Sequence, residues 1–160
     1  MRRSASIITL RDATAEDLSF LGYLYQDSRR EEVAAWGWPE TQREQFLRMQ
    51  FDAQRQSYRA SFPDAVDRIV FLEDAPVGHM LVGRESEGLR LIDIAVLGEH
   101  RNRGIGARLL RDLLRECQTE RWSMYLQVLL GNPAIRLYER LGFRQTGCNF
   151  MYVQMEWNPL

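Results

Sequence analysis

The feature that most constrains the fold of this chain is a glycine turn between a predicted strand and a predicted helix. The apolar run of residues 89–97 leads into residues 101–107, Arg-Asn-Arg-Gly-Ile-Gly-Ala, where a helix begins. Two glycines let the backbone turn tightly and approach a ligand without Cβ clashes. The amides at a helix start have no partner inside the helix and lie at the positive end of its dipole. The turn therefore predicts a binding site for a diphosphate.

Two other nucleotide-binding motifs do not fit this turn. The Rossmann pattern needs a third glycine at the position where Leu109 stands. The P-loop needs a Lys-Ser/Thr pair after its second glycine, and none is present. For the turn taken alone, a glycine-containing helix start with surface arginines and no ligand stays an alternative.

A second motif lies downstream of the turn. Residues 131–143, Gly-Asn-Pro-Ala-Ile-Arg-Leu-Tyr-Glu-Arg-Leu-Gly-Phe, follow a predicted strand at residues 123–129. The ordered pair of motifs resembles the GNAT superfamily of N-acetyltransferases, with its Arg/Gln-x-x-Gly-x-Gly/Ala turn and its Asn-Pro-Ala…Leu-Tyr-x-x-Leu-Gly-Phe segment. The resemblance covers roughly residues 89–145, and the order of the predicted elements agrees with it.

The hydrophobic patterns predict one domain over residues 1–160 with an α/β (α+β) fold. Predicted strands cover residues 7–11, 68–73, 77–84, 89–97 and 123–129, with a last strand or hairpin in 145–157; predicted helices run from Thr14 to about Tyr25, from 41 to 62, from 104 to 117 and from 133 to 141. Thr41 and Glu44 predict a capping box, after a break over residues 29–40 with a loop at 36–39. The resemblance implies a mixed, mostly antiparallel central sheet of six to seven strands flanked by about four helices. It also implies a parallel strand pair that splays apart at the cofactor site.

Composition narrows the class of protein. The net charge of -1, from 21 basic and 22 acidic residues, gives no field that would attract nucleic acid. Cys117 and Cys148 lie outside any Cys-x-x-Cys pair, which argues against a disulfide framework and against a metal site. We therefore expect a cytoplasmic protein with no metal. No apolar run is long enough for a membrane span, so no membrane partner is expected.

The resemblance implies acetyl-CoA as cosubstrate and assigns its binding residues. The backbone of Ile94, Ala95 and Val96 would pair with the pantetheine arm and the thioester carbonyl. The diphosphate would be held by Arg101, Asn102, Arg103, Gly104, Ile105, Gly106 and Ala107. Asn132 would hydrogen-bond the pantetheine region. A buried strand is the alternative interpretation of residues 94–96, and both can hold because the contacts use backbone groups.

The resemblance also implies direct attack of a primary amine in a ternary complex, with Tyr138 as general acid. A phenol with a pKa near 10 can protonate the departing thiolate. From the residues alone, a core aromatic side chain beside Leu137 and Leu141 is the alternative.

The general base stays open. Some family members carry a glutamate on the strand after the helix, where this chain has Gln127, which cannot act as a base. Asp93, between Ile92 and Ile94, is the next candidate, because a buried carboxylate is costly unless it is paired. A structural, hydrogen-bonded carboxylate at the sheet edge is the alternative.

Aromatic residues gather in the first half of the chain, where the acceptor site is expected: Trp36, Trp38, Phe46, Phe51, Tyr58 and Phe62. Aromatic rings with nearby carboxylates can bind a cationic amine, although helix packing is the favoured interpretation for most of these residues. We single out Glu31 and Trp38 as tentative substrate residues, since both lie in the predicted loop region. The acceptor is expected to be a small-molecule or peptide amine.

Three alternatives remain. The chain could be a non-catalytic acyl-CoA-sensing or protein-binding module on the same fold, which Tyr138 argues against and Gln127 slightly favours. The donor could carry a longer acyl chain. The family also admits a homodimer through the C-terminal strands, with Tyr152 and Trp157 at the interface.

Overall fold

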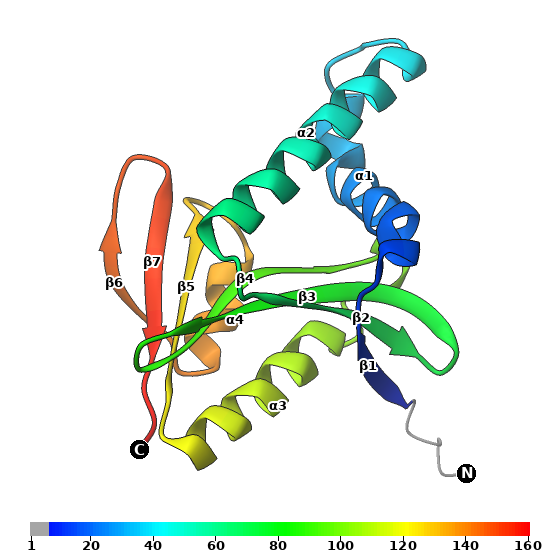
Figure 1. The fold of residues 1–160 in the computed structure, drawn as a ribbon. Coiled ribbons are helices and arrows are strands. Elements are labelled where there is room, and N and C mark those ends of the chain that lie inside the picture. Colours follow the sequence, from blue (N-terminus) through cyan, green and yellow to red (C-terminus); the bar gives the residue numbers. More distant parts are fainter. Residues whose placement is uncertain (1–6) are drawn as a thin grey trace, which may run out of the picture. The chain divides into compact units, whose positions relative to one another are not determined.

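The computed structural model describes residues 7–160. They form a mixed α/β fold with one mostly antiparallel sheet in the strand order β1-β2-β3-β4-β5-β7-β6, in which β4 and β5 are parallel (Figure 1). The strands are β1 Ile8–Asp12, β2 Val66–Leu72, β3 Ala75–Glu85, β4 Gly88–Val96, β5 Ser123–Leu129, β6 Arg144–Cys148 and β7 Tyr152–Trp157; the helices are α1 Leu18–Ala34, α2 Glu40–Ser61, α3 Ile105–Glu120 and α4 Ala134–Arg140.

By packing, the described residues divide into two compact units. The N-terminal unit comprises the described part of Met1–Leu81 together with Ile94–Ile105, and the C-terminal unit comprises Val82–Asp93 and Gly106–Leu160. The strands β3 and β4 each contribute residues to both units. The predicted sheet of six to seven strands with about four helices is confirmed.

The N-terminal unit carries the two long helices on the first strands. The strand β1 pairs antiparallel with β2, from Ile8 opposite Leu72 to Asp12 opposite Arg68. The helices α1 and α2 form a hairpin above these strands (Figure 1). Ring contact between Tyr25 and Phe51, with centroids 5.7 Å apart, joins the two helices. Buried side chains of both helices add to this contact: Leu21, Leu24, Val33 and Leu47.

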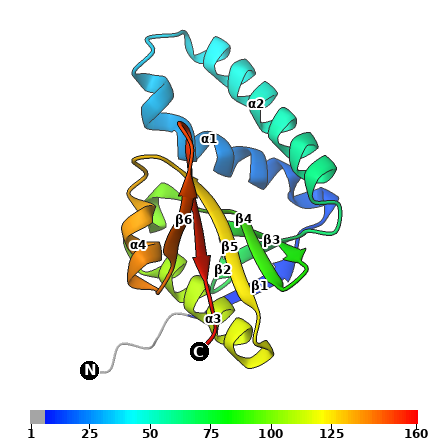
Figure 2. The ribbon, with the colours of Figure 1, turned by 90° about the vertical axis from the view of Figure 1, so that its left-hand side faces the viewer.

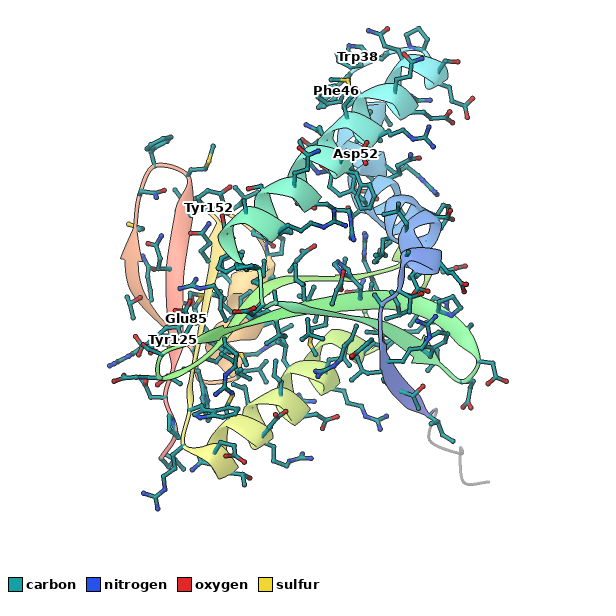
Figure 3. The ribbon with its side chains drawn as sticks, in the orientation of Figure 1. Trp38, Phe46, Asp52, Glu85, Tyr125 and Tyr152 are labelled. Carbon is teal, nitrogen blue, oxygen red and sulfur yellow. The ribbon has the colours of Figure 1, made fainter. Side chains whose placement is uncertain are left out.

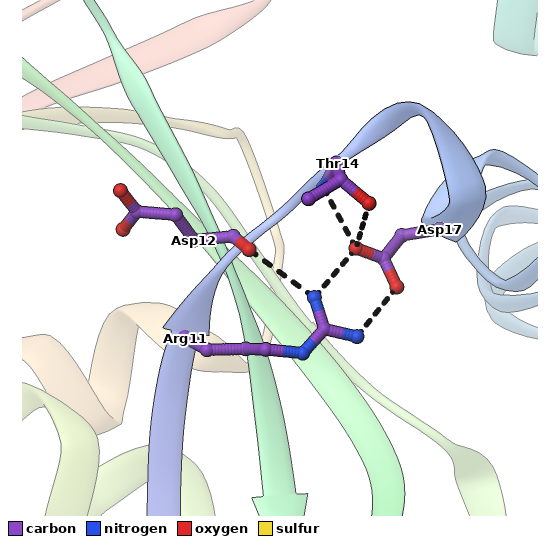
Figure 4. A network of polar contacts seen from close by, with 4 residues as sticks. All are labelled: Arg11, Asp12, Thr14 and Asp17. Carbon is purple, nitrogen blue, oxygen red and sulfur yellow. Dashed lines mark hydrogen bonds and ion pairs between the residues drawn. The ribbon is translucent and has the colours of Figure 1, made fainter.

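A polar network fixes the entry into α1 (Figure 4). The guanidinium of Arg11 donates to both carboxylate oxygens of Asp17 at 2.7 and 2.8 Å, and the Thr14 amide donates to the same carboxylate at 2.7 Å. Hydrogen bonds to a carboxylate stabilise its charged form, and those from Arg11 and then Thr14 hold the pKa of Asp17 well below its usual range. The predicted helix start at Thr14 is confirmed, with a short 3-10 turn at Ala15–Asp17 leading into α1.

The C-terminal unit holds the parallel strand pair (Figure 2). The strand β5 pairs with β4 from Ser123 opposite Gly88 to Leu126 opposite Leu91. A Cβ at Gly88 would lie 1.8 Å from the Ser123 carbonyl oxygen, so this close approach requires glycine. On its other edge β5 pairs antiparallel with β7, which forms a hairpin with β6. The helix α3 buries one apolar face, made of Leu109, Leu110, Leu113, Leu114 and Cys117.

Two sequence predictions about the helical hairpin are wrong. The helix α1 continues to Ala34 instead of ending near Tyr25. Its second half has few apolar residues and is stabilised by ion pairs one turn apart, Arg30 with Asp27 and Arg29 with Glu32, which a hydrophobic pattern does not reveal. The capping box at Thr41 is absent, because α2 begins at Glu40 with Pro39 as its N-cap and no side-chain capping bond. Proline suits a helix start, where its missing N–H is not needed.

Among the described residues, none of the helices combines the length and apolar character that crossing a bilayer requires.

We predict that Asp17→Asn lowers the free energy of unfolding at pH 7, because the amide cannot carry the charge that Arg11 binds. A carboxylate with a depressed folded-state pKa stabilises the fold above its unfolded pKa of about 3.9 and progressively less as pH falls below it. Urea unfolding at pH 7 and at acid pH checks this, with the difference between the proteins shrinking in acid. The exposed neighbour Asp12 is the control, and an Asp12→Asn effect as large as that of Asp17→Asn would contradict the prediction.

Candidate active site

The predicted glycine turn follows β4. A short 3-10 turn at Gly98–His100, which the sequence did not predict, leads into it, and α3 begins at Ile105. Asn102 and Gly104 have left-handed backbone angles, with φ of 61° and 80°. No described atom lies within 4 Å of a Cβ placed at Gly104 or Gly106. The turn thus presents backbone amides beside open space, an arrangement that can bind an anion.

Arg101, the first residue of the turn, points back to the protein. Its Nε donates to the Val96 carbonyl at 3.0 Å, and its Nη2 lies 3.8 Å from Oδ2 of Asp27. The same Oδ2 accepts the Gly98 amide at 2.8 Å, and the Asp27 side chain is only 11% exposed. The predicted role of Arg101 therefore changes: its side chain holds the turn against β4 and α1, and its amide donates to the Gly98 carbonyl at 3.2 Å.

Asp27 is a site residue that sequence reasoning missed. It lies on α1, 71 residues before Gly98, and no local pattern connects the two positions. Only the packing of α1 in the N-terminal unit brings the carboxylate to the turn.

The predicted thioester-binding segment, Ile94 to Val96, is half-buried at the end of β4. In the C-terminal unit, the parallel ladder of β4 and β5 ends among the described residues at Leu91 and Leu126, before Asp93. The end of that ladder agrees with the predicted splaying of the two strands. In the N-terminal unit, β3 borders the segment, because the Leu97 amide donates to the Val77 carbonyl at 2.8 Å.

Tyr138 lies on α4 and is 7% exposed. Its ring packs edge-on against Phe143, with centroids 5.7 Å apart. Burial, and then the negative charge of Asp93 in the same unit, raises the pKa of Tyr138 to about 12. The phenol therefore keeps its proton at neutral pH, and Asp93, itself half-buried, is close enough to act on it.

Asn132 and Gln127 occupy the loop and strand before α4. The Asn132 side-chain oxygen accepts the Ala134 amide at 2.9 Å, so this exposed residue shapes the start of α4. Gln127 is exposed on β5 opposite Gln154 of β7.

The tentative substrate residues lie on the helical hairpin. The rings of Trp36, Trp38 and Phe46 pack together with centroids 5.1 to 5.5 Å apart, as Figure 3 shows for Trp38 and Phe46. The three rings therefore pack against one another, and the role of Trp38 towards a substrate stays a prediction. Glu31 is exposed on α1, so its predicted place in a loop is wrong.

The candidate interface residues of β7, Tyr152 and Trp157, contact other residues of the C-terminal unit. Tyr152 lies opposite Leu129 of β5, and the Trp157 ring lies 3.2 Å from a Cβ placed at Gly142. Both side chains are half-buried. Among the described residues, no group of three or more His, Cys, Asp or Glu side chains is arranged to hold a metal ion.

The sheet with one parallel pair and the glycine turn before α3 are features of an acetyltransferase fold. Residues 23–143 match the acetyltransferase (GNAT) family, and the chain belongs to this family. The family uses acetyl-CoA. Among proteins of curated function, none matches this sequence.

Solved structures show the same fold at low sequence identity. The PaiA N-acetyltransferase from Thermoplasma acidophilum, in complex with coenzyme A, has a TM-score of 0.71 at 18% identity, over 95% of this chain and 99% of that one. A spermidine N-acetyltransferase chimera from Vibrio cholerae has a TM-score of 0.66 at 21% identity, over 94% and 95%. A ribosomal-protein-alanine N-acetyltransferase from Escherichia coli has a TM-score of 0.62 at 18% identity, over 95% and 94%.

We predict that Gly104→Ala weakens coenzyme A binding at least tenfold, about 1.4 kcal/mol, in isothermal titration calorimetry. A side chain at a left-handed φ costs roughly 1–2 kcal/mol, and relief of that strain rotates the neighbouring amides away from the diphosphate. Gly37 is a matched control, because its φ of 70° is close to the 80° of Gly104 and no atom lies within 4 Å of a Cβ placed at either residue.

The Gly37→Ala variant should lose similar thermal stability and keep its affinity for coenzyme A. Equal losses of affinity in both variants, or in neither, would contradict the role of the turn.

Proposed function

We propose that this chain transfers an acetyl group from acetyl-CoA to a primary amine by direct attack in a ternary complex. The observation that carries the proposal is the buried phenol of Tyr138, whose pKa is raised by burial and then by the charge of Asp93 in the same unit. Tyr138 can donate a proton and Asp93 can accept one. Acetyl transfer needs both, because the sulfur gains a proton while the nitrogen loses one.

Binding is proposed to use mainly backbone groups. The amides of residues 102–107 hold the diphosphate, with Arg103 adding positive charge from an exposed position. The backbone of Ile94 to Val96 pairs with the pantetheine arm, although the Val96 carbonyl already accepts one hydrogen bond from Arg101. The Asn132 side chain contacts the pantetheine from the start of α4.

The acetyl transfer forms one carbon–nitrogen bond, breaks one carbon–sulfur bond and includes three proton transfers. The amine lone pair forms a bond to the acetyl carbon, and the carbon–sulfur bond breaks. The departing thiolate takes the phenolic proton of Tyr138. The nitrogen gives a proton to Asp93 as the amide forms, and Asp93 returns that proton to Tyr138. Protonation of Asp93 removes one cause of the raised pKa of Tyr138, so the phenol becomes a better donor when the thiolate needs it.

The acceptor class is proposed to be a small-molecule or peptide primary amine. The structural neighbours include enzymes for spermidine and for a ribosomal-protein alanine, and both bear primary amines. A panel of spermidine, an aminoglycoside and an alanine-starting peptide separates these acceptors by mass spectrometry of the products. A chain that binds acetyl-CoA and acetylates none of a broad amine panel would be a binding module.

We predict that Tyr138→Phe lowers kcat by about 10²- to 10⁴-fold, because the thiolate loses its proton donor. Affinity for acetyl-CoA should stay within about twofold, since the proposed contacts use backbone groups. Steady-state rates with the best panel amine, and calorimetry with acetyl-CoA, give these two quantities.

Tyr125→Phe is the matched control, since Tyr125 is a half-buried tyrosine of β5 in the same unit (Figure 3). Its rate should equal that of the unaltered chain. A Tyr138→Phe variant with full activity would exclude Tyr138 from the mechanism.

A further inference from the structure

The helix α2, in the N-terminal unit, turns a mostly polar face towards α1 and β2. Although the helix has 22 residues, Leu47 is its one fully buried side chain. Its half-buried positions beyond Leu47 recur every three or four residues, as one face of a helix does: Gln50, Phe51, Gln54, Arg55 and Tyr58. Polar groups that turn inward need partners, which can be protein groups, water or a ligand.

The guanidinium of Arg55 is weakly paired within the protein. Its side chain is 28% exposed, and its ion pair among the described residues joins Nη1 to Oδ2 of Asp67 over 3.9 Å. That separation is too long for a hydrogen bond. The other oxygen of Asp67 lies 2.8 Å from Nδ1 of His79. A guanidinium has five N–H donors, and no described residue accepts a hydrogen bond from Arg55, so these donors are open to water or to an anion.

Aromatic rings hold this guanidinium in place. Its carbon Cζ lies 5.5 Å from the centroid of the Phe51 ring, one turn earlier on α2. The Phe51 ring in turn contacts the ring of Tyr25 on α1. A cation over the face of an aromatic ring is attracted to it. Because the group is already ordered, an anion that binds it spends less free energy on ordering the side chain.

The guanidinium lies near the strand segment proposed to hold the thioester. Its neighbour Asp67 is on β2, and the sheet continues through β3 to β4 (Figure 1). A Cβ at Gly78 of β3, directly before His79, would lie 2.4 Å from the Ala95 carbonyl oxygen, so β3 contacts the segment at this point. Neighbouring strands lie about 4.8 Å apart, which puts β2 about 10 Å from β4. All these residues belong to the N-terminal unit, and a small molecule can span that distance.

We propose that Arg55 binds a carboxylate of the acceptor, so that the acceptor is a primary amine that also carries a carboxylate. This inference rests on the proposed acetyltransferase function and names the substrate class. The planar guanidinium donates two parallel N–H bonds to the carboxylate, a geometry that lysine lacks. The negative charge of Asp67 beside it attracts the ammonium group of the same molecule, so a zwitterion is favoured over a plain anion.

Matched acceptors test the proposal. Comparing γ-aminobutyrate with butylamine, and ε-aminocaproate with hexylamine, keeps the carbon chain and changes the carboxylate. We expect the unaltered chain to favour the carboxylate member of at least one pair by about 10- to 100-fold in kcat/KM, the effect of one charged hydrogen-bonded pair. Arg55→Met, which keeps a similar length without charge, should abolish this preference. The rate with the plain amine should stay within about twofold, which a general loss of structure would not allow.

The same helix offers a control, since Arg48 is exposed on α2 two turns before Arg55. Arg48→Met should keep the full preference for the carboxylate. Arg55→Lys should keep part of it, because the charge remains and the planar fork is lost. The dissociation constant for acetyl-CoA should stay within about twofold in every variant. A large loss of acetyl-CoA affinity in Arg55→Met would assign the guanidinium to the cosubstrate and overturn the proposal.

The Nε–H resonance of Arg55 in ¹⁵N-resolved NMR spectra gives a readout that needs no turnover. The resonance, assigned by its loss in Arg55→Met, should shift with ε-aminocaproate and stay in place with hexylamine. An unaltered chain that acetylates no amine contradicts the proposed function, and the resonance then decides on the carboxylate site by itself. An active chain with the same preference in Arg55→Met, or with no preference and no shift of the resonance, overturns the role of Arg55 alone.

Discussion

The proposed activity depends on main-chain amides that a diphosphate can bind. At the start of α3, Gly104 takes a left-handed φ of 80° and open space borders its α-carbon and that of Gly106. These amides have no partner within the helix and lie at the positive end of its dipole. A chain with a net charge of -1 can therefore bind a strongly anionic cosubstrate through local geometry alone.

Contacts within the N-terminal unit hold the first part of the turn in place. Asp27 accepts the Gly98 amide, while Arg101 contacts both Asp27 and the Val96 carbonyl. These contacts join α1, the end of β4 and the turn. A carboxylate this close to an anion site would repel the ligand if it were unpaired, so the adjacent guanidinium makes the arrangement compatible with diphosphate binding. The proposed proton transfers use a separate pair of groups, Asp93 and Tyr138.

The local parts of the site could be predicted from the sequence, and the long-range parts could not. The glycine turn, the start of α4 and the order of the strands along the chain follow from short patterns whose meaning does not depend on distant residues. The contacts of Asp27 with Gly98 and of His79 with Asp67 depend on how helices and strands pack, and their residue types occur on any protein surface. The second half of α1 was missed for a related reason, because ion pairs and not an apolar stripe extend that helix.

The most direct test of the central claim is to observe the amides themselves. In ¹⁵N-resolved NMR spectra, coenzyme A and inorganic pyrophosphate should both shift the backbone N–H resonances of Gly104 and Gly106. Pantetheine, which lacks the diphosphate, should leave those resonances in place while it shifts signals of Ile94 to Val96. Binding of coenzyme A without movement of the two glycine resonances would contradict the account.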